Sequence, residues 1–196
     1  MGDRREQVLD AAIALLGERG VRSVTHRAVD ARAGLPAGST SNLFRTRDAL
    51  FDGIVERITP REQAIWEGLA ARSCPTTPAE LARAFAELAR EATTTHRTLT
   101  LARYAILVEA GIRPELRRQL ITVGARVSSS AQTWLRIAGS ADPDRDAHVV
   151  SNYWTGLVLH ELAIPAAVFD PEPRLTALLE SLVAPPVTTA ASASHR

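Results

Sequence analysis

A run of short polar side chains interrupts the amphipathic pattern near the N-terminus. Residues 37–42 read "AGSTSN", and arginines lie on both sides of this run. Hydroxyl and amide groups hydrogen-bond the base edges and phosphates of nucleic acids, and an asparagine pairs with adenine through two hydrogen bonds. Short side chains also let a helix approach the base edges closely. The candidate reading face consists of Ala37, Ser39, Thr40, Ser41 and Asn42, and Arg27, Arg45 and Arg47 are placed to meet phosphates.

Two short helices and a glycine turn would position this face. Thr25 is a suitable N-cap for a first helix that ends at Ala33, and Gly34 supplies the positive φ angle of a tight turn. Pro36 suits the first position of a second helix, which we expect to end near Phe44. A helix, a turn and a second helix of these lengths form the helix-turn-helix of DNA-binding proteins. The apolar residues expected to bury and anchor the motif are Leu35, Leu43 and Phe44.

The same residues also have plainer interpretations. The helices could form a subdomain that binds another protein. Asn42 could simply face solvent, and Arg45 and Arg47 could solvate the start of the next helix. Positive charge at a helix N-terminus opposes the helix dipole, which favours a functional reason for these arginines.

The charge pattern is locally basic within a nearly neutral chain. The 196 residues carry a formal net charge of +1, and all 23 basic residues are arginine. Between Arg22 and Arg47, five arginines accompany a single acid, Asp30. Such a local excess of positive charge is a modest electrostatic footprint of a phosphate-binding surface.

Apolar residues recur at helical spacing along the rest of the chain, and no alternating strand pattern interrupts them. The sequence therefore predicts an all-α fold with about nine helices. After Thr46 a long helix begins, in which Thr59, Pro60 and Glu62 form a second start signal, so we expect a kink or a restart there. The expected domains are a helix-turn-helix domain at residues 1–46, a larger helical domain at 47–184 and a disordered tail at 185–196.

Signatures of several other protein classes are missing from the sequence. It has no stretch of about 18 uncharged apolar residues for a membrane span, and no apolar signal core near the N-terminus. The single cysteine, Cys74, fits a reducing cytoplasm, where we expect the protein to work. The five histidines lack the i, i+3 or i, i+4 pairing of a helical metal site, and no phosphate-binding glycine loop occurs. We therefore expect no metal, no cofactor, no membrane partner and no enzymatic activity.

The N-terminal residues resemble the DNA-binding domain of TetR-family transcriptional regulators. The likeness covers residues 8–51 and lies in "AAIALLGERGVRSVTHRAV", "ARAGLPAGSTSNLF" and "RTRDALF", which have the order and spacing of that domain. It implies a homodimer whose recognition helices reach successive major grooves of a pseudo-palindromic operator. It also implies a C-terminal domain that binds a small molecule. Binding then moves the two DNA-binding domains of the dimer out of register with the operator. By position, Thr25 and Arg27 look like DNA contacts from the helix before the turn.

Three features depart from the usual pattern of that family. Ser41 and Leu43 stand where the family usually has tyrosine or histidine, which often contact phosphates. Asp30 stands where alanine is usual, at the crossing of the two short helices. We expect it either to pair with a residue such as Arg27 or to point outward and weaken DNA binding. Pro60 interrupts what is usually one long connecting helix, and we expect it to form a hinge that transmits the ligand signal.

Aromatic residues of the larger domain are candidates for a ligand pocket, because such pockets are largely apolar with a few polar groups. Each aromatic residue could instead pack in the core, and a histidine there could be a satisfied core residue rather than a ligand contact. The candidate pocket residues are Trp66, Phe85, Tyr104, Trp134, Trp154 and His160.

The helices near residues 147–164 and 174–183 are the candidate dimer surface. The first is apolar on more faces than one core needs, and the second carries a narrow leucine stripe. Two such helices from each subunit would form a four-helix bundle across a two-fold axis. The alternative is that both helices complete the core of the monomer.

These features predict a ligand-responsive, homodimeric regulator that binds a double-stranded DNA operator. The simplest form is a repressor that a small apolar or amphipathic effector releases. A second hypothesis is a helical ligand-binding or protein-docking module that has lost DNA binding. The two differ in salt dependence, because affinity that rests on neutralised phosphates falls steeply with ionic strength.

Overall fold

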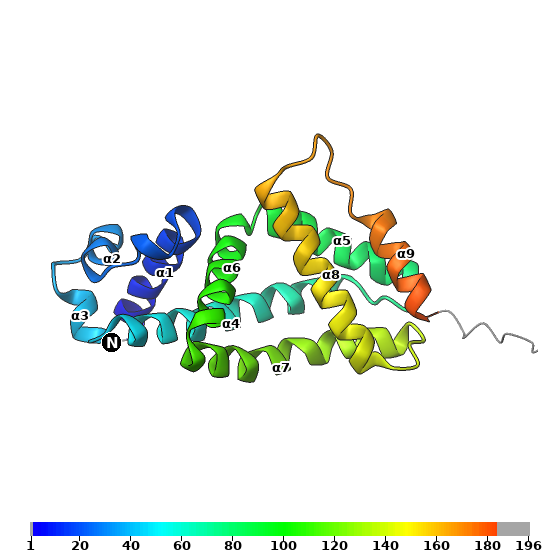
Figure 1. Cartoon of the computed structure of the whole chain (residues 1–196), viewed down its shortest axis with the longest axis horizontal. Helices are drawn as coiled ribbons and strands as arrows, with labels where there is room; N and C mark the ends of the chain where they lie inside the picture. The colour runs from blue at the N-terminus through cyan, green and yellow to red at the C-terminus, as the bar shows by residue number, and fades with distance from the viewer. Residues whose placement is uncertain (1, 184–196) are drawn as a thin grey trace, which may run out of the picture.

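The computed structural model describes residues 2–183, with the backbone alone described for residues 123–128. All regular structure in this part of the chain is helical, which confirms the all-α prediction. Figure 1 shows an elongated molecule with α1–α3 and the N-terminus at one end and α9 toward the other. The elements are α1 (Gly2–Arg19), the 3₁₀ turn η1 (Val21–Ser23), α2 (His26–Ala33), α3 (Ser39–Leu43), α4 (Arg47–Arg72), α5 (Pro78–Thr93), α6 (Arg97–Ile112), α7 (Pro114–Ile137), α8 (Pro143–Ala163) and α9 (Glu172–Val183).

Side-chain caps begin several of these helices. Thr25 and Thr46 each accept a hydrogen bond from the backbone amide three residues later, at the starts of α2 and α4. Thr77 and Glu80 form a reciprocal capping box at the start of α5. Gly34 ends α2 with a φ of 66°, a backbone conformation that glycine adopts without steric cost. The predicted N-cap at Thr25 and the predicted turn glycine at Gly34 are confirmed.

The second helix of the helix-turn-helix, α3, is shorter than predicted. It begins at Ser39 rather than Pro36, because residues 36–38 form a turn that ends at Gly38 with a φ of 90°. Leu43 is 36% exposed, so its predicted burial is wrong, whereas Phe44 is buried. A Cβ at Gly53 would lie 2.7 Å from the Phe44 ring, so the absence of a side chain lets α4 pass close to this ring.

One continuous helix, α4, connects the N-terminal head (α1–α3) with the remaining helices, which we call the body. It runs through Pro60 from Arg47 to Arg72, so the predicted restart is wrong. Thr59 caps nothing here, because its hydroxyl donates a hydrogen bond to the carbonyl oxygen of Val55 within the helix. Proline has no amide hydrogen and therefore leaves one carbonyl of the preceding turn without its helical donor.

Head and body share a hydrophobic core where α1 packs against α6. Ile13 of α1 belongs to the same buried cluster as Leu99 and Ile106 of α6. The two backbones approach closely, since a Cβ added to Gly17 would lie 2.1 Å from the carbonyl oxygen of Thr98. The head is therefore packed directly onto the body in addition to being linked to it through α4.

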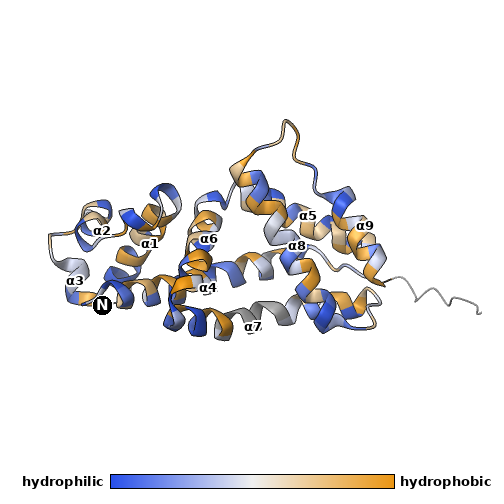
Figure 2. Cartoon of the chain, viewed as in Figure 1, coloured by the Kyte–Doolittle hydropathy of each residue, from blue (hydrophilic) through white to orange (hydrophobic). Residues whose placement is uncertain are grey.

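The two C-terminal helices differ in how they use their apolar residues. Leu175 and Leu179 of α9 are fully buried in a cluster with residues of α5. By contrast, α8 leaves Val149, Tyr153 and Leu159 at the surface. Figure 2 shows that hydrophobic and hydrophilic residues are mixed along α8. The leucine stripe of α9 therefore completes the core of the monomer, whereas part of the apolar surface of α8 is not covered by any of the described residues.

None of the helices within residues 2–183 has both the length and the apolar character needed to cross a bilayer. The described side chains include no cluster of three or more His, Cys, Asp or Glu that could hold a metal ion. Cys74 is exposed. The tail predicted at 185–196 lies outside the described residues.

Candidate functional site

The first candidate site is the outer face of the head around α3. Thr40, which was predicted to belong to this face, is fully buried. Its amide and its hydroxyl both donate hydrogen bonds to the carboxylate of Asp30. The structure thus removes Thr40 from the reading face and gives it a packing role. The members of the predicted face that reach the surface are Ala37, Ser39, Ser41 and Asn42.

The residues expected to contact the DNA backbone also divide into two groups. Those that are exposed beside α3 are Thr25, Arg27 and Arg45. Arg47 instead turns inward, where its Nη2 donates a hydrogen bond to the carbonyl oxygen of Val21 at 2.8 Å. Its guanidinium also lies 5.2 Å from the centroid of the Phe51 ring. In this structure Arg47 fastens the head to the start of α4, in place of the predicted contact with a phosphate.

Two side chains of α2 hold the two ends of α3. The buried carboxylate of Asp30 accepts hydrogen bonds from the Gly38 amide at 2.8 Å, the Thr40 amide at 2.7 Å and the Thr40 hydroxyl at 2.6 Å. One turn earlier, Nε2 of His26 donates to the carbonyl oxygen of Phe44 at 2.7 Å. A helix of five residues is too short to be stable by itself, so these bonds set its position.

The surroundings of Asp30 keep its carboxylate ionised. Burial by itself would raise the pKa of Asp30, but the hydrogen bonds from Thr40 and Gly38 outweigh burial and lower this pKa. Asp30 does have the partner that its position requires, but the partners are Gly38 and Thr40 rather than Arg27. The alternative expectation, that the side chain points outward, is wrong. Sequence reasoning missed the role because the capped amides lie eight and ten residues away, beyond any local capping pattern.

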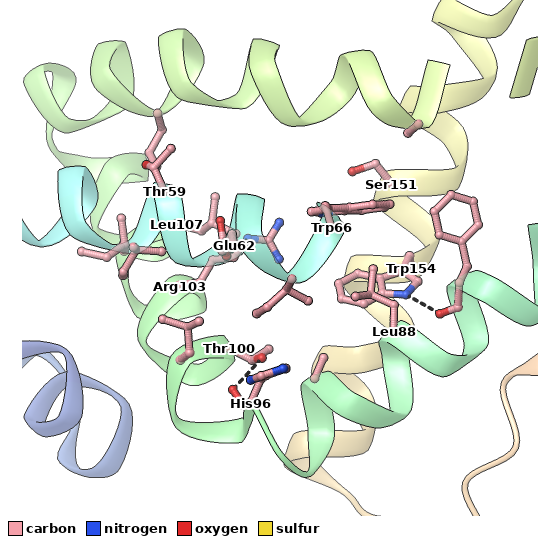
Figure 3. Close-up of a pocket in the computed structure, with 18 of the residues that line it drawn as sticks. Thr59, Glu62, Trp66, Leu88, His96, Thr100, Arg103, Leu107, Ser151 and Trp154 are labelled. Atoms are coloured by element: carbon pink, nitrogen blue, oxygen red, sulfur yellow. Dashed lines mark hydrogen bonds and ion pairs between the residues drawn. The ribbon is translucent and has the colours of Figure 1, made fainter. Parts of the chain in front are cut away.

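The second candidate site is a cavity of about 260 Å³ lined by residues of α4, α5, α6, α7 and α8 (Figure 3). Most of its wall is apolar, as in many small-molecule sites. Three of the predicted pocket residues, Trp66, Phe85 and Trp154, line it. The indole Nε1 of Trp154 donates a hydrogen bond to the carbonyl oxygen of Phe85 at 3.0 Å, which holds this ring in place.

The other three predicted pocket residues are absent from the described wall of the cavity. Tyr104 is buried behind it, where its hydroxyl donates to the carbonyl oxygen of Thr155 and burial raises its pKa. Trp134 packs against Trp66 with the ring centroids 5.8 Å apart. His160 is exposed near the end of α8. Tyr104 and Trp134 therefore support the wall, and His160 lies away from it.

The cavity also contains a charged pair that sequence reasoning did not place there. Oε1 of Glu62 on α4 lies 3.3 Å from Nε of Arg103 on α6. Figure 3 shows these two side chains together, with Trp66 and Trp154 farther along the cavity. Burial raises the pKa of Glu62, and the positive charge of Arg103 only partly offsets this effect.

Part of this pair could have been found from the sequence. Glu62 and Trp66 are four residues apart on one helix, a spacing that places both side chains on the same face. The capping-box interpretation of Glu62 hid this relation. Arg103 has no such local signal, because its place beside Glu62 depends on how α6 packs against α4. The remaining polar side chains of the cavity are Thr59, His96, Thr100 and Ser151.

A helix-turn-helix head joined to a helical body with a small-molecule cavity defines the class of ligand-binding DNA regulators. Residues 8–54 match the family described as "Bacterial regulatory proteins, tetR family", and residues 76–185 match "Tetracyclin repressor-like, C-terminal domain". The chain belongs to the TetR family of transcriptional regulators.

Solved structures share this fold over nearly the whole chain. The multidrug binding protein EbrR in complex with ethidium is 27% identical with a TM-score of 0.70, and the match covers 92% of this chain and 98% of EbrR. A TetR-family member from Streptomyces coelicolor A3 (SCO1917) is 26% identical with a TM-score of 0.70 and the same coverage. A TetR-family regulator from Rhodococcus sp. is 19% identical with a TM-score of 0.75, covering 92% of this chain and 99% of its own, which shows the fold alone. A comparison with curated protein sequences gave no match.

Proposed function

We propose that this chain is a repressor that binds a pseudo-palindromic operator as a homodimer and leaves it when a small apolar or amphipathic molecule fills the cavity. The observation that carries this proposal is a set of residues shared by the cavity wall and the hydrophobic core that joins the head to the body. These residues are Val55, Ile58, Leu99 and Ile106. A ligand that displaces them changes the packing beneath the head, and a ligand that prefers the displaced arrangement shifts the protein toward it.

In this proposal α3 enters the major groove with its small polar face toward the bases. Ser41 and Asn42 are the exposed polar residues on the helix itself, and Ala37 and Ser39 lie at its start. Thr25, Arg27 and Arg45 contact the phosphates beside the groove. Their exposure around α3 supports these roles.

The proposed dimer forms through α8 and α9. Val149, Tyr153 and Leu159 are between 38% and 46% exposed, and they lie on a helix whose other side is already packed in the core. Burying this strip against the same strip of a second subunit would give the isologous contact of a two-fold dimer. The outer side of α9 would lie beside this dimer contact, because Leu175 and Leu179 on the inner side of α9 are already buried within the monomer.

The effector class is supported by both the cavity and a structural relative. The rings of Trp66, Phe85 and Trp154 offer a surface for a flat, apolar molecule. EbrR, at 25–27% identity, has been solved with ethidium and with malachite green, which are aromatic molecules. We extend this preference for aromatic effectors to the present chain.

The alternative, a docking module without DNA binding, loses one of its supports. It rested partly on Asp30, whose charge between the two short helices was expected to disturb the motif. In the structure this carboxylate instead holds α3 in place. The missing aromatic side chains at Ser41 and Leu43 are the remaining reason to test it.

The test is fluorescence anisotropy of the purified protein on labelled DNA fragments from around its own gene, at two salt concentrations. We expect saturable binding that weakens steeply with salt and survives excess non-specific DNA, because several phosphates are neutralised at each half-site. An aromatic effector added to the complex should lower the anisotropy. Binding that hardly depends on salt, or none at low salt, would favour the docking module.

A further inference from the structure

The wall of the cavity combines several aromatic rings with one carboxylate. Glu62 is the single acidic side chain among the described residues that line the cavity. It lies one helical turn before Trp66, and the rings of Phe85 and Trp154 complete the aromatic part of the wall. The faces of aromatic rings carry partial negative charge and attract cations. The carboxylate and the aromatic rings therefore both favour a positively charged ligand.

The charge of Glu62 is only partly balanced within the described part of the chain. Its ion-pair partner there is Arg103, through one contact of 3.3 Å. The side chain of Glu62 is 23% exposed, so water solvates it poorly, and its raised pKa reports the same shortage of stabilising interactions. A second positive group beside this carboxylate would relieve that shortage.

Arg103 is less dependent on the pair than Glu62 is. Its guanidinium also lies 5.5 Å from the centroid of the Tyr104 ring. It therefore keeps a favourable aromatic neighbour when Glu62 binds another group. The cavity is thus better prepared to receive a positive charge at Glu62 than a negative charge at Arg103.

We propose that the effector of this regulator is a lipophilic cation, whose apolar part lies against Trp66, Phe85 and Trp154 while its positive charge pairs with Glu62. The inference rests on the proposed function, because it assigns a chemical class to the effector of that cavity. Binding of the cation competes with Arg103 for the carboxylate. An effector of this class would therefore loosen the one ion pair that joins α4 to α6 across the described part of the cavity.

Three probes with the same ring system separate charge from shape: 1-naphthylmethylamine, which is a cation at neutral pH, 1-naphthylmethanol and 1-naphthoate. Their dissociation constants are measured by calorimetry on the full chain. We expect the amine to bind about tenfold more tightly than the alcohol, the ratio that one interaction of about 1.4 kcal/mol produces. The carboxylate probe should bind most weakly.

Two variants assign this preference to the pair. Glu62→Gln should remove most of the preference for the amine and should improve binding of 1-naphthoate, because Arg103 then lacks its acidic partner. Arg103→Gln should strengthen binding of the amine. Glu67→Gln is the matched control, since Glu67 is exposed on the same helix and does not line the cavity, and it should leave the preference unchanged.

The outcomes separate the two levels of the proposal. Equal affinities of amine and alcohol, or an amine preference that survives in Glu62→Gln, would overturn the cation inference. If the alcohol nevertheless releases the operator, the repressor function stands with an uncharged effector. Failure of all three probes to bind the folded chain would also overturn the inference, while operator binding is judged separately by its salt dependence.

Discussion

Replacing Asp30 with alanine tests whether the buried carboxylate holds the recognition helix. The change removes three hydrogen bonds and leaves the amide and hydroxyl of Thr40 without an acceptor in buried surroundings. Hydrogen bonds to a charged group contribute about 1.5–3 kcal/mol each, but bonds that share one carboxylate are not additive. We therefore expect the free energy of unfolding to fall by about 3 kcal/mol. Operator affinity should fall by more than about tenfold under conditions in which the variant is still folded.

The assay combines urea denaturation with operator anisotropy, and a surface acid of the head serves as the control. Glu18 accepts a hydrogen bond from Arg32 at 2.6 Å, but both side chains are more than a third exposed, so Glu18→Ala should cost less than about 1 kcal/mol. If Asp30→Ala loses no more stability and no more operator affinity than Glu18→Ala, the anchoring role is refuted. Asp30→Asn should be intermediate, because it keeps one oxygen as an acceptor.

The same carboxylate predicts a pH dependence with a definite sign. The pKa of Asp30 is lowered in the folded protein from its ordinary value of 3.8. Its contribution to stability is therefore fully present above that ordinary value and is lost as the pH falls through the lower folded pKa. The difference in unfolding free energy between the natural chain and Asp30→Asn should shrink in this acidic range. A difference that stays constant there would contradict the assignment.

Four further changes probe the head and its attachment. Arg45→Ala should lower operator affinity and reduce its salt slope by about one, whereas Arg47→Ala should mainly lower stability in urea denaturation, because Arg47 bonds within the protein. Pro60→Ala should raise the free energy of unfolding by about 1–3 kcal/mol. By the hinge hypothesis it should also change ligand-induced release more than ligand-free operator affinity, and equal effects on both would contradict that hypothesis. Gly17→Ala should cost about 2 kcal/mol or more, because the new Cβ would meet the backbone of Thr98, and a melting temperature equal to that of the natural chain would refute this.

The regular parts of the fold could be predicted because their signals are local. Apolar residues at helical spacing and caps such as Thr25, Thr46 and Thr77 act within one or two turns. The incorrect predictions concern helix boundaries that are set by residues far away in the sequence. A proline and a threonine at 59–60 resemble a helix start, but residues on both sides pack into cores that keep α4 continuous. The start of α3 was misplaced because Asp30, eight residues before Gly38, holds the turn in front of it.

The sequence predicted those residues of the two candidate sites whose exposure or burial follows from residue type alone. Exposed small polar residues were expected at Ser41 and Asn42, and the structure places them at the surface. Which way Thr40 faces depends on the rotation of α3 against α2. In the body, choosing Trp66 and Trp154 as cavity residues but Trp134 as a supporting one requires the crossing geometry of α4, α7 and α8. Helical periodicity within one segment carries no information about that geometry.

The residues of the cavity wall fall into two groups, which differ in what an amino-acid substitution would disturb. Val55 and Ile106 line the cavity and also pack in the core beneath the head, so a substitution there alters ligand fit and head position together. Phe85, Ser151 and Trp154 line it without belonging to that core. New effector specificities can therefore be acquired through the second group while the mechanical link to the head is preserved. Engineering of a biosensor from this scaffold should diversify those positions and leave the shared ones intact.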